Sequence, residues 1–389
     1  MKMWSWNVDK FVEEFTVGDD YIVDKLFVKY DCKASIAHVE MLYKMNVLNK
    51  EEKEKIIAVL EEIIELSSKG KFEIKMEEED CHTAIENYVI KKLGDLGKKM
   101  HMFRSRNEQI VTAIRLYCKE EIEGVINLLK ELVSSLKHVK KKYGDVKIPG
   151  YTHTRKAMPS SIALWCESFI ESMKDNIKLL KFIANLIDKS PAGSGAGYGL
   201  PASIDRKFLS SELGFKSVQN PLYVQNSRTK FEADVLHGLW HVMFDLNKIA
   251  GDIILFSSDN FKYFSLPKNI CTGSSIMPHK RNPDVLEIVR GNYHIIKSYE
   301  DCMKGISANL ISGYHRDFQL TKKFLVKGFK IVKNCINAVS LVLRNIEVNS
   351  KLCKKDMSKE LFSVEKSYKL AVRGIPFRDA HKIVSLEFS

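Results

Sequence analysis

Hydrophobic side chains recur at three- and four-residue steps through five long segments of this chain. In the first, about residues 106–143, Ile110, Ile114, Ile122 and Ile126 follow this spacing, which is typical of an amphipathic α-helix. The other four predicted helices cover about residues 160–189, 229–256, 284–306 and 317–346. Each is about twice the 11–12-residue mean of globular helices, or longer. We therefore expect an all-α protein built around a long central helix bundle.

Prolines and helix-capping residues indicate where helices begin and end along the chain. No proline precedes Pro149, so helices can run without interruption before it. Ser105 and Glu108 form an S-x-x-E capping box at the start of the first long helix. No alternating strand pattern and no internal repeat is evident. We predict a smaller helical N-terminal domain (1–104), the central long-helix bundle (105–349) and a short C-terminal helical domain (350–389).

Composition narrows the class of protein. The chain has 389 residues, 45% of them hydrophobic, and no run approaches the ~18 apolar residues of a membrane span. The first residues lack the apolar run of a secretory signal. The eight cysteines are scattered without a C-x-x-C pair, which favours reduced thiols over disulfides or a zinc site. These features predict a cytoplasmic protein without a metal and without a membrane partner.

The net charge of +12, from 61 Lys and Arg against 49 Asp and Glu, has two interpretations. It suits a nucleic-acid binder or an enzyme with an anionic small-molecule substrate. No nucleic-acid-binding motif accompanies it, so we expect no nucleic-acid partner.

The stretch Gly273–Pro283 carries the clearest chemistry. Its glycine, hydroxyls and two prolines predict a loop, and basic residues precede the helix expected from residue 284. Backbone N–H groups at that helix start, together with the Lys280 ammonium, suit a carboxylate or a phosphate. By composition alone, a solvated basic loop is an equally good interpretation.

The full string resembles the GSSxMPxKxNP signature of the fumarase/aspartase superfamily. Further blocks resemble the argininosuccinate lyase branch: Arg104–Gln109 its RSRNDQ, Gly150–His153 its GYTH, and Tyr314, Gln319 and Lys322 its YxxxxQxxK pattern. The resemblance covers nearly the whole chain. It implies β-elimination of argininosuccinate to L-arginine and fumarate, the last step of arginine biosynthesis, with no metal or organic cofactor. It also implies a homotetramer whose active sites are shared between subunits.

The resemblance assigns roles to individual residues. Ser274 and His153 would be the base and the acid, and which residue takes which role stays open. Lys280 would stabilise the negative charge that develops on a succinyl carboxylate, and Glu287 would orient the imidazole and raise its basicity. The implied substrate-binding residues are Ser35, Arg106, Asn107, Thr152, Asn282, Tyr314, Gln319 and Lys322.

The chain also departs from the family pattern. Met102 and Phe103 replace a Thr-Gly pair, Glu108 replaces Asp, and His315 replaces Asn, which leaves the fine substrate geometry open. Family chains generally continue beyond the last matched block, so the C-terminal domain is expected to be short. Adenylosuccinate lyase of the same superfamily and a non-catalytic, crystallin-like structural relative remain as alternatives.

Overall fold

The computed structural model describes residues 8–388, which form two compact units. The first unit comprises the residues up to Gly124, Leu179–Leu239 and Lys297–Lys330. The second comprises Val125–Lys178, Trp240–Ile296 and the residues from Ile331 onward. Each unit combines stretches from different predicted domains, because every boundary between the units falls inside a long helix.

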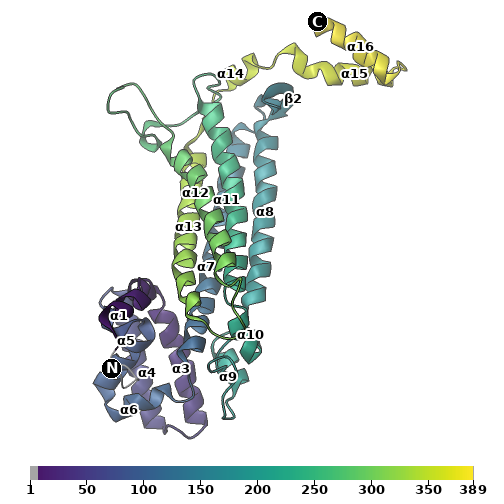
Figure 1. Ribbon diagram of the computed structural model, residues 1–389. Helices are drawn as coiled ribbons and strands as arrows, with labels where there is room; N and C mark the ends of the chain where they lie inside the picture. The colour runs from purple at the N-terminus through teal and green to yellow at the C-terminus, as the bar shows by residue number, and fades with distance from the viewer. Residues whose placement is uncertain (1–7, 389) are drawn as a thin grey trace. The chain divides into compact units, whose positions relative to one another are not determined.

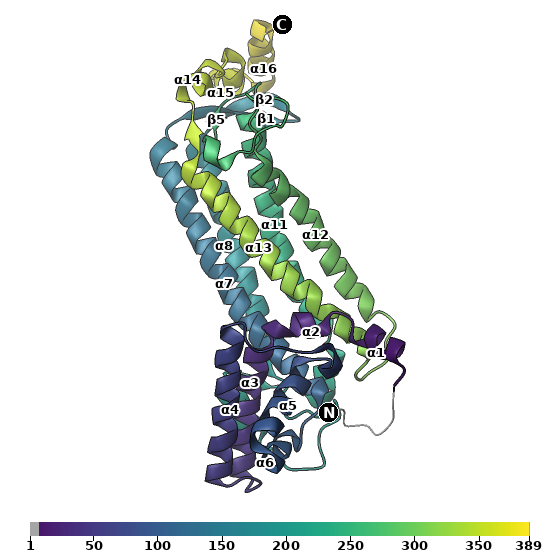
Figure 2. The ribbon, with the colours of Figure 1, turned by 90° about the vertical axis from the view of Figure 1, so that its left-hand side faces the viewer.

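Five long helices dominate the chain, and they run side by side in both ribbon views (Figures 1 and 2). They are α7 (Arg106–Tyr143), α8 (Ile162–Ile187), α11 (Lys230–Ser257), α12 (Asp284–Ile306) and α13 (Lys322–Asn345). These bounds lie close to those that the hydrophobic spacing predicts. Only the last prediction differs appreciably, because residues Arg316–Thr321 form a 3₁₀ helix before α13 begins. The all-α fold class is confirmed.

The core of the second unit is built from the apolar stripes of these helices. On α7, Val125, Leu129 and Leu132 are fully buried, and on α11 Leu246 and Ile253 are as well. The spacings of four and three residues on α7 and of seven residues on α11 place each set on one helix face. Burial of these stripes is the main stabilising contribution to the bundle.

A β-hairpin in the second unit differs from the sequence prediction of no strands. Strand β1 (Lys147–Thr152) pairs antiparallel with β2 (Arg155–Ser161), and the register shifts between Gly150 and Tyr151. Prolines in both strands and the shift at Gly150 interrupt the alternation of polar and apolar residues. A period-two search therefore misses this hairpin.

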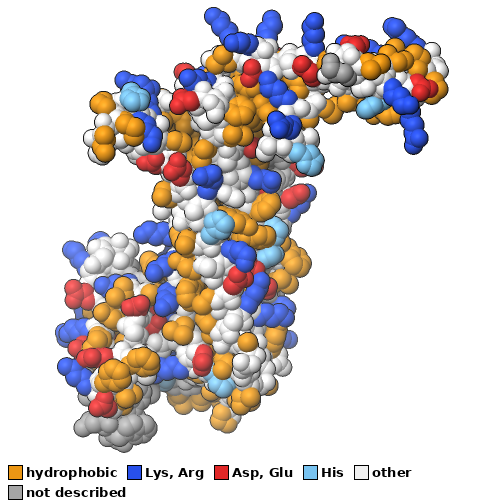
Figure 3. Space-filling view, turned by 45° about the horizontal axis from the view of Figure 1, so that its top comes forward, with side chains coloured by type: hydrophobic (Ala, Val, Ile, Leu, Met, Phe, Trp, Pro, Cys, Tyr) orange, Lys and Arg blue, Asp and Glu red, His pale blue; other side chains and the backbone are white. Residues whose placement is uncertain are grey.

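The second unit ends in three short helices, α14 (Ser350–Lys355), α15 (Ser363–Val372) and α16 (Phe377–Ser385). A two-residue strand pair, β5 (Phe264–Ser265) with β6 (Glu347–Val348), precedes them. Lys and Arg side chains gather along these helices (Figure 3). The exposed ones are Lys351, Lys354, Lys355, Lys359, Lys369, Arg373, Arg378 and Lys382. Part of the excess positive charge is thus spread over a solvated surface.

The first unit packs shorter helices around the N-terminal part of α7. They are α1 (Lys10–Val17), α2 (Asp20–Val23), α3 (Val28–Lys44), α4 (Lys50–Ser68), α5 (Cys81–Leu93), α6 (Asp95–Lys98), α9 (Arg206–Glu212) and α10 (Pro221–Asn226). A short parallel pair, β3 (Lys189–Ser190) with β4 (Ser217–Val218), completes the unit. Across residues 8–388, no helix is both long and apolar enough to cross a membrane.

Candidate active site

His153 lies at the tip of the β1–β2 hairpin, in the second unit. The connecting turn consists of His153 and Thr154, whose φ angles are 51° and 59°. Two successive residues with positive φ make the tight turn that matches the twist of a two-stranded ribbon. Thr152, His153 and Thr154 are all exposed. The hairpin therefore presents the imidazole to solvent on a short, well-defined turn.

Hydrogen bonds through two tyrosine hydroxyls connect this hairpin to other parts of the second unit. The Tyr151 hydroxyl lies 3.2 Å from that of Tyr263, which donates a 2.6 Å hydrogen bond to Asp356 Oδ2. Lys156 Nζ, on the other strand, donates to the backbone carbonyl of Asp356 at 3.1 Å. Both strands are thus attached to the segment that follows α14.

Ser274 and its neighbours form the loop predicted before α12. The Ser274 Oγ accepts hydrogen bonds from the backbone N–H groups of Ile276 and Met277, at 3.3 and 3.1 Å. Donors aimed at a hydroxyl oxygen favour its anionic form. The base of the loop is closed by backbone hydrogen bonds between Thr272 and Asn282. The loop therefore gives Ser274 part of the stabilisation that a serine base requires.

The other residues predicted for this part of the site lie in the same loop or shortly after it in the sequence. Asn282 Nδ2 donates to the Gly273 carbonyl at 3.3 Å, and Lys280 is exposed. Glu287 is exposed in the first turn of α12. Within the described residues, the side chains of His153, Lys280 and Glu287 make no hydrogen bond or ion pair, so they are available to a substrate or to another copy of the chain.

A cavity of about 220 Å³ in the first unit collects most of the predicted substrate-binding residues. Its lining includes Arg106, Asn107, Tyr314, Gln319 and Lys322, which come from two distant parts of the sequence. The volume is below the roughly 300–1,000 Å³ of usual ligand pockets, so it suits a group of amino-acid size.

Ser35 does not line this cavity. It is fully buried on α3, where its Oγ accepts a hydrogen bond from Arg104 Nη1 at 2.9 Å. Its predicted role in binding stays a prediction. Gln319 does line the cavity, but its Nε2 donates to the carbonyls of Thr16 and Val17 at 2.7 and 3.1 Å. Its amide oxygen accepts a hydrogen bond from Arg316 Nε at 3.1 Å, which leaves one lone pair of this oxygen to contact a substrate.

Lys322 is buried in the cavity wall and carries two carboxylate partners. Its Nζ lies 2.5 Å from Asp24 Oδ1 and 2.9 Å from Asp20 Oδ2. Burial raises the pKa of Asp20 to about 6, against the opposing attraction of Lys322. The lysine charge is thus compensated before any substrate arrives.

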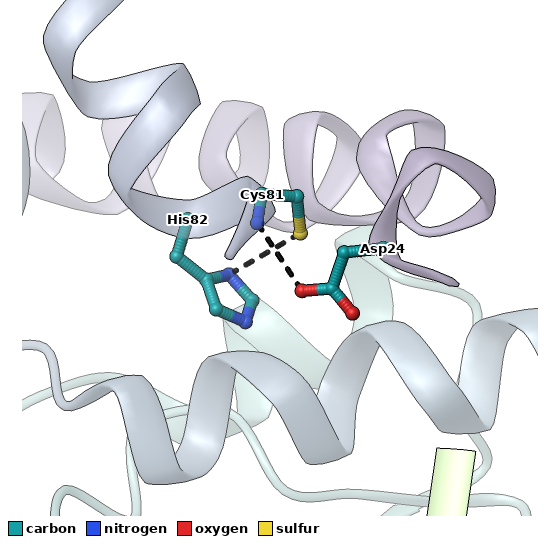
Figure 4. Close-up of side chains that lie close together, drawn as sticks. All are labelled: Asp24, Cys81 and His82. Atoms are coloured by element: carbon teal, nitrogen blue, oxygen red, sulfur yellow. Dashed lines mark hydrogen bonds between the residues drawn. The ribbon is translucent and has the colours of Figure 1, made fainter. Parts of the chain in front are cut away.

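Asp24, Cys81 and His82 form a compact buried cluster whose donor atoms lie within 4.8 Å of one another (Figure 4). The atoms are already engaged: Asp24 contacts Lys322 through Oδ1, and its Oδ2 accepts the Cys81 backbone N–H at 3.2 Å. His82 Nδ1 lies 3.1 Å from Asp31 Oδ2. Burial raises the pKa of the Cys81 thiol well above its ordinary value. The lysine ammonium already supplies the cation here, so we assign no metal to the cluster.

His82 and Arg228 also line the cavity, together with the acidic residues Asp20, Glu79 and Asp80, and none of these is among the predicted site residues. Burial disfavours the charged imidazole of His82, but the carboxylates of Asp31, Asp80 and Asp24 together outweigh this effect and raise its pKa. The sequence signal that could have identified His82 is its position two residues after Asp80, at the start of α5. For Arg228, the signal was an opposite charge, Glu232, four residues further along the chain at the start of α11.

The departures from the family pattern have visible consequences. Phe103 stands where the family pattern has glycine, and its φ is 61°, a conformation that glycine adopts more easily. Glu108 is buried and accepts the Gly195 backbone N–H through Oε2 at 2.9 Å. Its other oxygen faces the Ser105 N–H at 3.4 Å, which is one half of the predicted capping box. The other half is not formed, because the Ser105 hydroxyl accepts a hydrogen bond from the backbone N–H of Asn107 and not from that of Glu108.

Solved structures share this fold. The chain superposes with a TM-score of 0.83 on the class II fumarase of Schistosoma mansoni, at 16% identity, covering 96% of this chain and 87% of that one. It superposes with a TM-score of 0.81 on an EDDS lyase, at 20% identity, covering 98% of this chain and 76% of that one. At these identities the likeness concerns the fold alone.

Sequence relatives decide the family. A family model described as "Lyase" matches residues 3–296. The chain is 47% identical over 390 residues to the argininosuccinate lyase of Thermotoga neapolitana, with 100% of this chain and 98% of that protein covered. This chain belongs to the argininosuccinate lyase family. A second relative, the argininosuccinate lyase of Parabacteroides distasonis, is 38% identical, with 99% of this chain and 87% of that protein covered. The resemblance drawn from the motifs is confirmed.

Proposed function

We propose that this chain cleaves argininosuccinate to L-arginine and fumarate. The observation that carries this proposal is the 47% identity to an argininosuccinate lyase over the full length of both chains. The exposed Ser274 loop, the His153 hairpin and a cavity lined by charges of both signs agree with an elimination on a zwitterionic, multiply carboxylated substrate.

The elimination needs a base, an acid and a site for the developing charge. In the proposed sequence, the oxygen of Ser274 removes the proton from the carbon beside a succinyl carboxylate. The carbon–nitrogen bond then breaks, and the leaving nitrogen takes a proton from His153, which yields arginine and fumarate. The opposite assignment of the two roles balances equally, so base and acid stay interchangeable in this proposal.

Cationic and polar groups of the same loop would hold the intermediate. The carboxylate beside the deprotonated carbon becomes dianionic, and Lys280 and Asn282 are placed in the proposal as its partners. Glu287 would hold one imidazole nitrogen of His153 and keep the ring in the required tautomer. Thr152, next to the imidazole, would hydrogen-bond the same succinyl group.

The cavity of the first unit would hold the arginine half of the substrate. Tyr314, Asn107 and the Gln319 amide oxygen offer hydrogen bonds, and Arg106 and Lys322, each already beside a carboxylate of the chain, offer N–H donors. We further propose a homotetramer in which each active site draws residues from several copies. The unpaired side chains of His153 and Glu287 in the single chain support this arrangement.

The biological setting is part of the same proposal. The reaction would complete arginine biosynthesis, since arginine is its product. We place it in the cytoplasm because all eight cysteines, six of them buried, are free thiols, as is usual in a reducing compartment.

A substrate comparison tests the proposal. The purified protein is given argininosuccinate or adenylosuccinate, and fumarate formation is followed by absorbance. Turnover of argininosuccinate alone is expected. Turnover of adenylosuccinate alone would assign the chain to the other branch, and no fumarate from either substrate would indicate a non-catalytic relative.

A further inference from the structure

Arg228, two residues before α11 begins, is a buried cation beside the cavity of the first unit. Only 2% of its surface is exposed. Its Nε donates to Glu232 Oε1 at 2.9 Å, and its Nη2 donates to the Phe318 carbonyl at 3.1 Å and to Thr321 Oγ1 at 3.3 Å. The guanidinium also lies 5.2 Å from the centre of the Phe318 ring. Contacts with α11 and with the 3₁₀ helix Arg316–Thr321 therefore fix this side chain in one orientation.

The remaining nitrogen of this guanidinium has no partner. Nη1 is buried and makes no hydrogen bond within the described residues. A guanidinium has five N–H donors, and leaving donors of a charged group buried and unsatisfied is costly. Arg228 also belongs to the cavity lining. Arg228 therefore borders the cavity as a rigid cation with unused donors.

The charge balance around Arg228 points to an anion. Glu232, the only carboxylate that pairs with it among residues 8–388, is fully buried and also interacts with the buried Arg115. Two guanidinium groups therefore share one carboxylate. Burial lowers the pKa of Arg115 to about 10, which shows how costly positive charge is at this place. A carboxylate in the cavity would neutralise the excess.

The acidic residues of the cavity do not fill this role, because each already faces another cation. Asp80 lies 3.8 Å from Arg106, and Glu79 lies 3.6 Å from Arg316. Asp20 lies 2.9 Å from Lys322. Arg228 is thus the cavity cation whose compensating carboxylate is shared with a second arginine.

We propose that Arg228 binds the α-carboxylate of the arginine half of the substrate. This inference rests on the proposed function. The succinyl carboxylates are assigned there to the Ser274 loop in the second unit, which leaves the α-carboxylate as the anion for the first. The acidic residues on the cavity wall suit the cationic ammonium and guanidine groups of the same half.

Arginine and agmatine provide the test, because agmatine is arginine without its carboxylate. Each is measured as an inhibitor of the cleavage of argininosuccinate and as a ligand by calorimetry. A hydrogen-bonded carboxylate–guanidinium contact corresponds to about 10- to 150-fold in affinity, so the parent protein should prefer arginine by a factor in this range. Arg228→Met should reduce the preference to about threefold or less, while inhibition by fumarate stays unchanged.

Two further variants control for damage to the fold. Arg115→Met removes an equal buried charge next to the same glutamate, but Arg115 does not line the cavity, so the preference for arginine should remain. Arg228→Lys keeps the charge and loses the planar fork, so it should give an intermediate preference, and it carries the test if Arg228→Met does not fold. Thermal unfolding and the oligomeric state are recorded for every variant.

Each result bears on one hypothesis. A parent protein that binds agmatine as tightly as arginine overturns the inference without any variant. Arg228→Met that keeps the preference, or that weakens fumarate instead, overturns it as well. A parent protein that produces no fumarate from argininosuccinate refutes the proposed function, which is a different outcome from the loss of a preference between two ligands.

Discussion

Replacing Asp20 by asparagine is expected to stabilise the folded chain above pH 6, although the change removes an ion pair with Lys322. Burial raises the pKa of Asp20 from 3.8 to about 6 despite the attraction of that lysine. The folded state therefore binds the proton more tightly than the unfolded state does. Stability falls as the pH rises from 3.8 to 6, and the full penalty is present above that range.

The magnitude follows from the size of this difference. About two pKa units at 1.36 kcal/mol each correspond to a penalty of about 3 kcal/mol at pH 8. Asparagine carries no charge, so Asp20→Asn should raise the free energy of unfolding by up to this amount. The gain should shrink as the pH is lowered from 6 toward 4. Lys322 keeps Asp24 as its partner, at 2.5 Å.

Urea-induced unfolding at pH 8 and pH 5, at one protein concentration, measures the change. Asp19→Asn is the matched control, because Asp19 is the preceding residue and is exposed. It should alter the free energy of unfolding by less than about 0.5 kcal/mol. A loss of stability for Asp20→Asn at pH 8 would refute the reasoning.

The double variant Asp20→Asn/Asp24→Asn makes the argument stricter. Lys322 would then be a buried charge without a carboxylate, which costs about 3–5 kcal/mol. Each single variant leaves one carboxylate in place, so the double variant should lose far more than the two single effects combined. Additivity within about 0.5 kcal/mol would show that the lysine is compensated elsewhere.

The remaining predictions concern the proposed catalytic groups and the support of the hairpin that carries His153. Ser274→Ala and His153→Asn should each lower kcat by orders of magnitude without lowering the unfolding temperature, and a near-native rate for either would exclude its role. Co-refolding these two inactive variants should restore part of the activity, because mixed oligomers can contain sites with both residues intact; no recovery would argue against sites shared between copies. Tyr263→Phe removes the donor to Asp356 and should lower stability by about 1 kcal/mol, as a urea titration of the variant against the parent would show.

The long helices could be predicted because their signal is local. The apolar spacing between Ile110 and Ile126 reports which face of α7 is buried, and Pro283 marks the start of α12. The hairpin could not be found in this way. Its strands contain prolines, and their pairing is held by Tyr263 and Asp356, which lie about a hundred and two hundred residues further along the chain.

The candidate site likewise has a part with a local sequence signal and a part that depends on long-range contacts. The loop around Ser274 is contiguous, so its residues are visible as one motif. The ion pairs of Lys322 with Asp20 and Asp24 join residues about 300 positions apart, and only the fold brings them together. Sequence motifs single out candidate side chains, but they do not show that this lysine faces two carboxylates or that Arg228 shares its carboxylate with Arg115.

The backbone at the hairpin tip has a consequence for how the chain can be engineered. His153 and Thr154 both adopt positive φ, which costs a residue with a β-carbon about 1–2 kcal/mol relative to glycine. A chain optimised only to withstand heat would carry asparagine and glycine at these two positions. Libraries selected for thermostability should therefore enrich substitutions that remove the imidazole proposed to act in catalysis, so such a selection needs an activity screen alongside it.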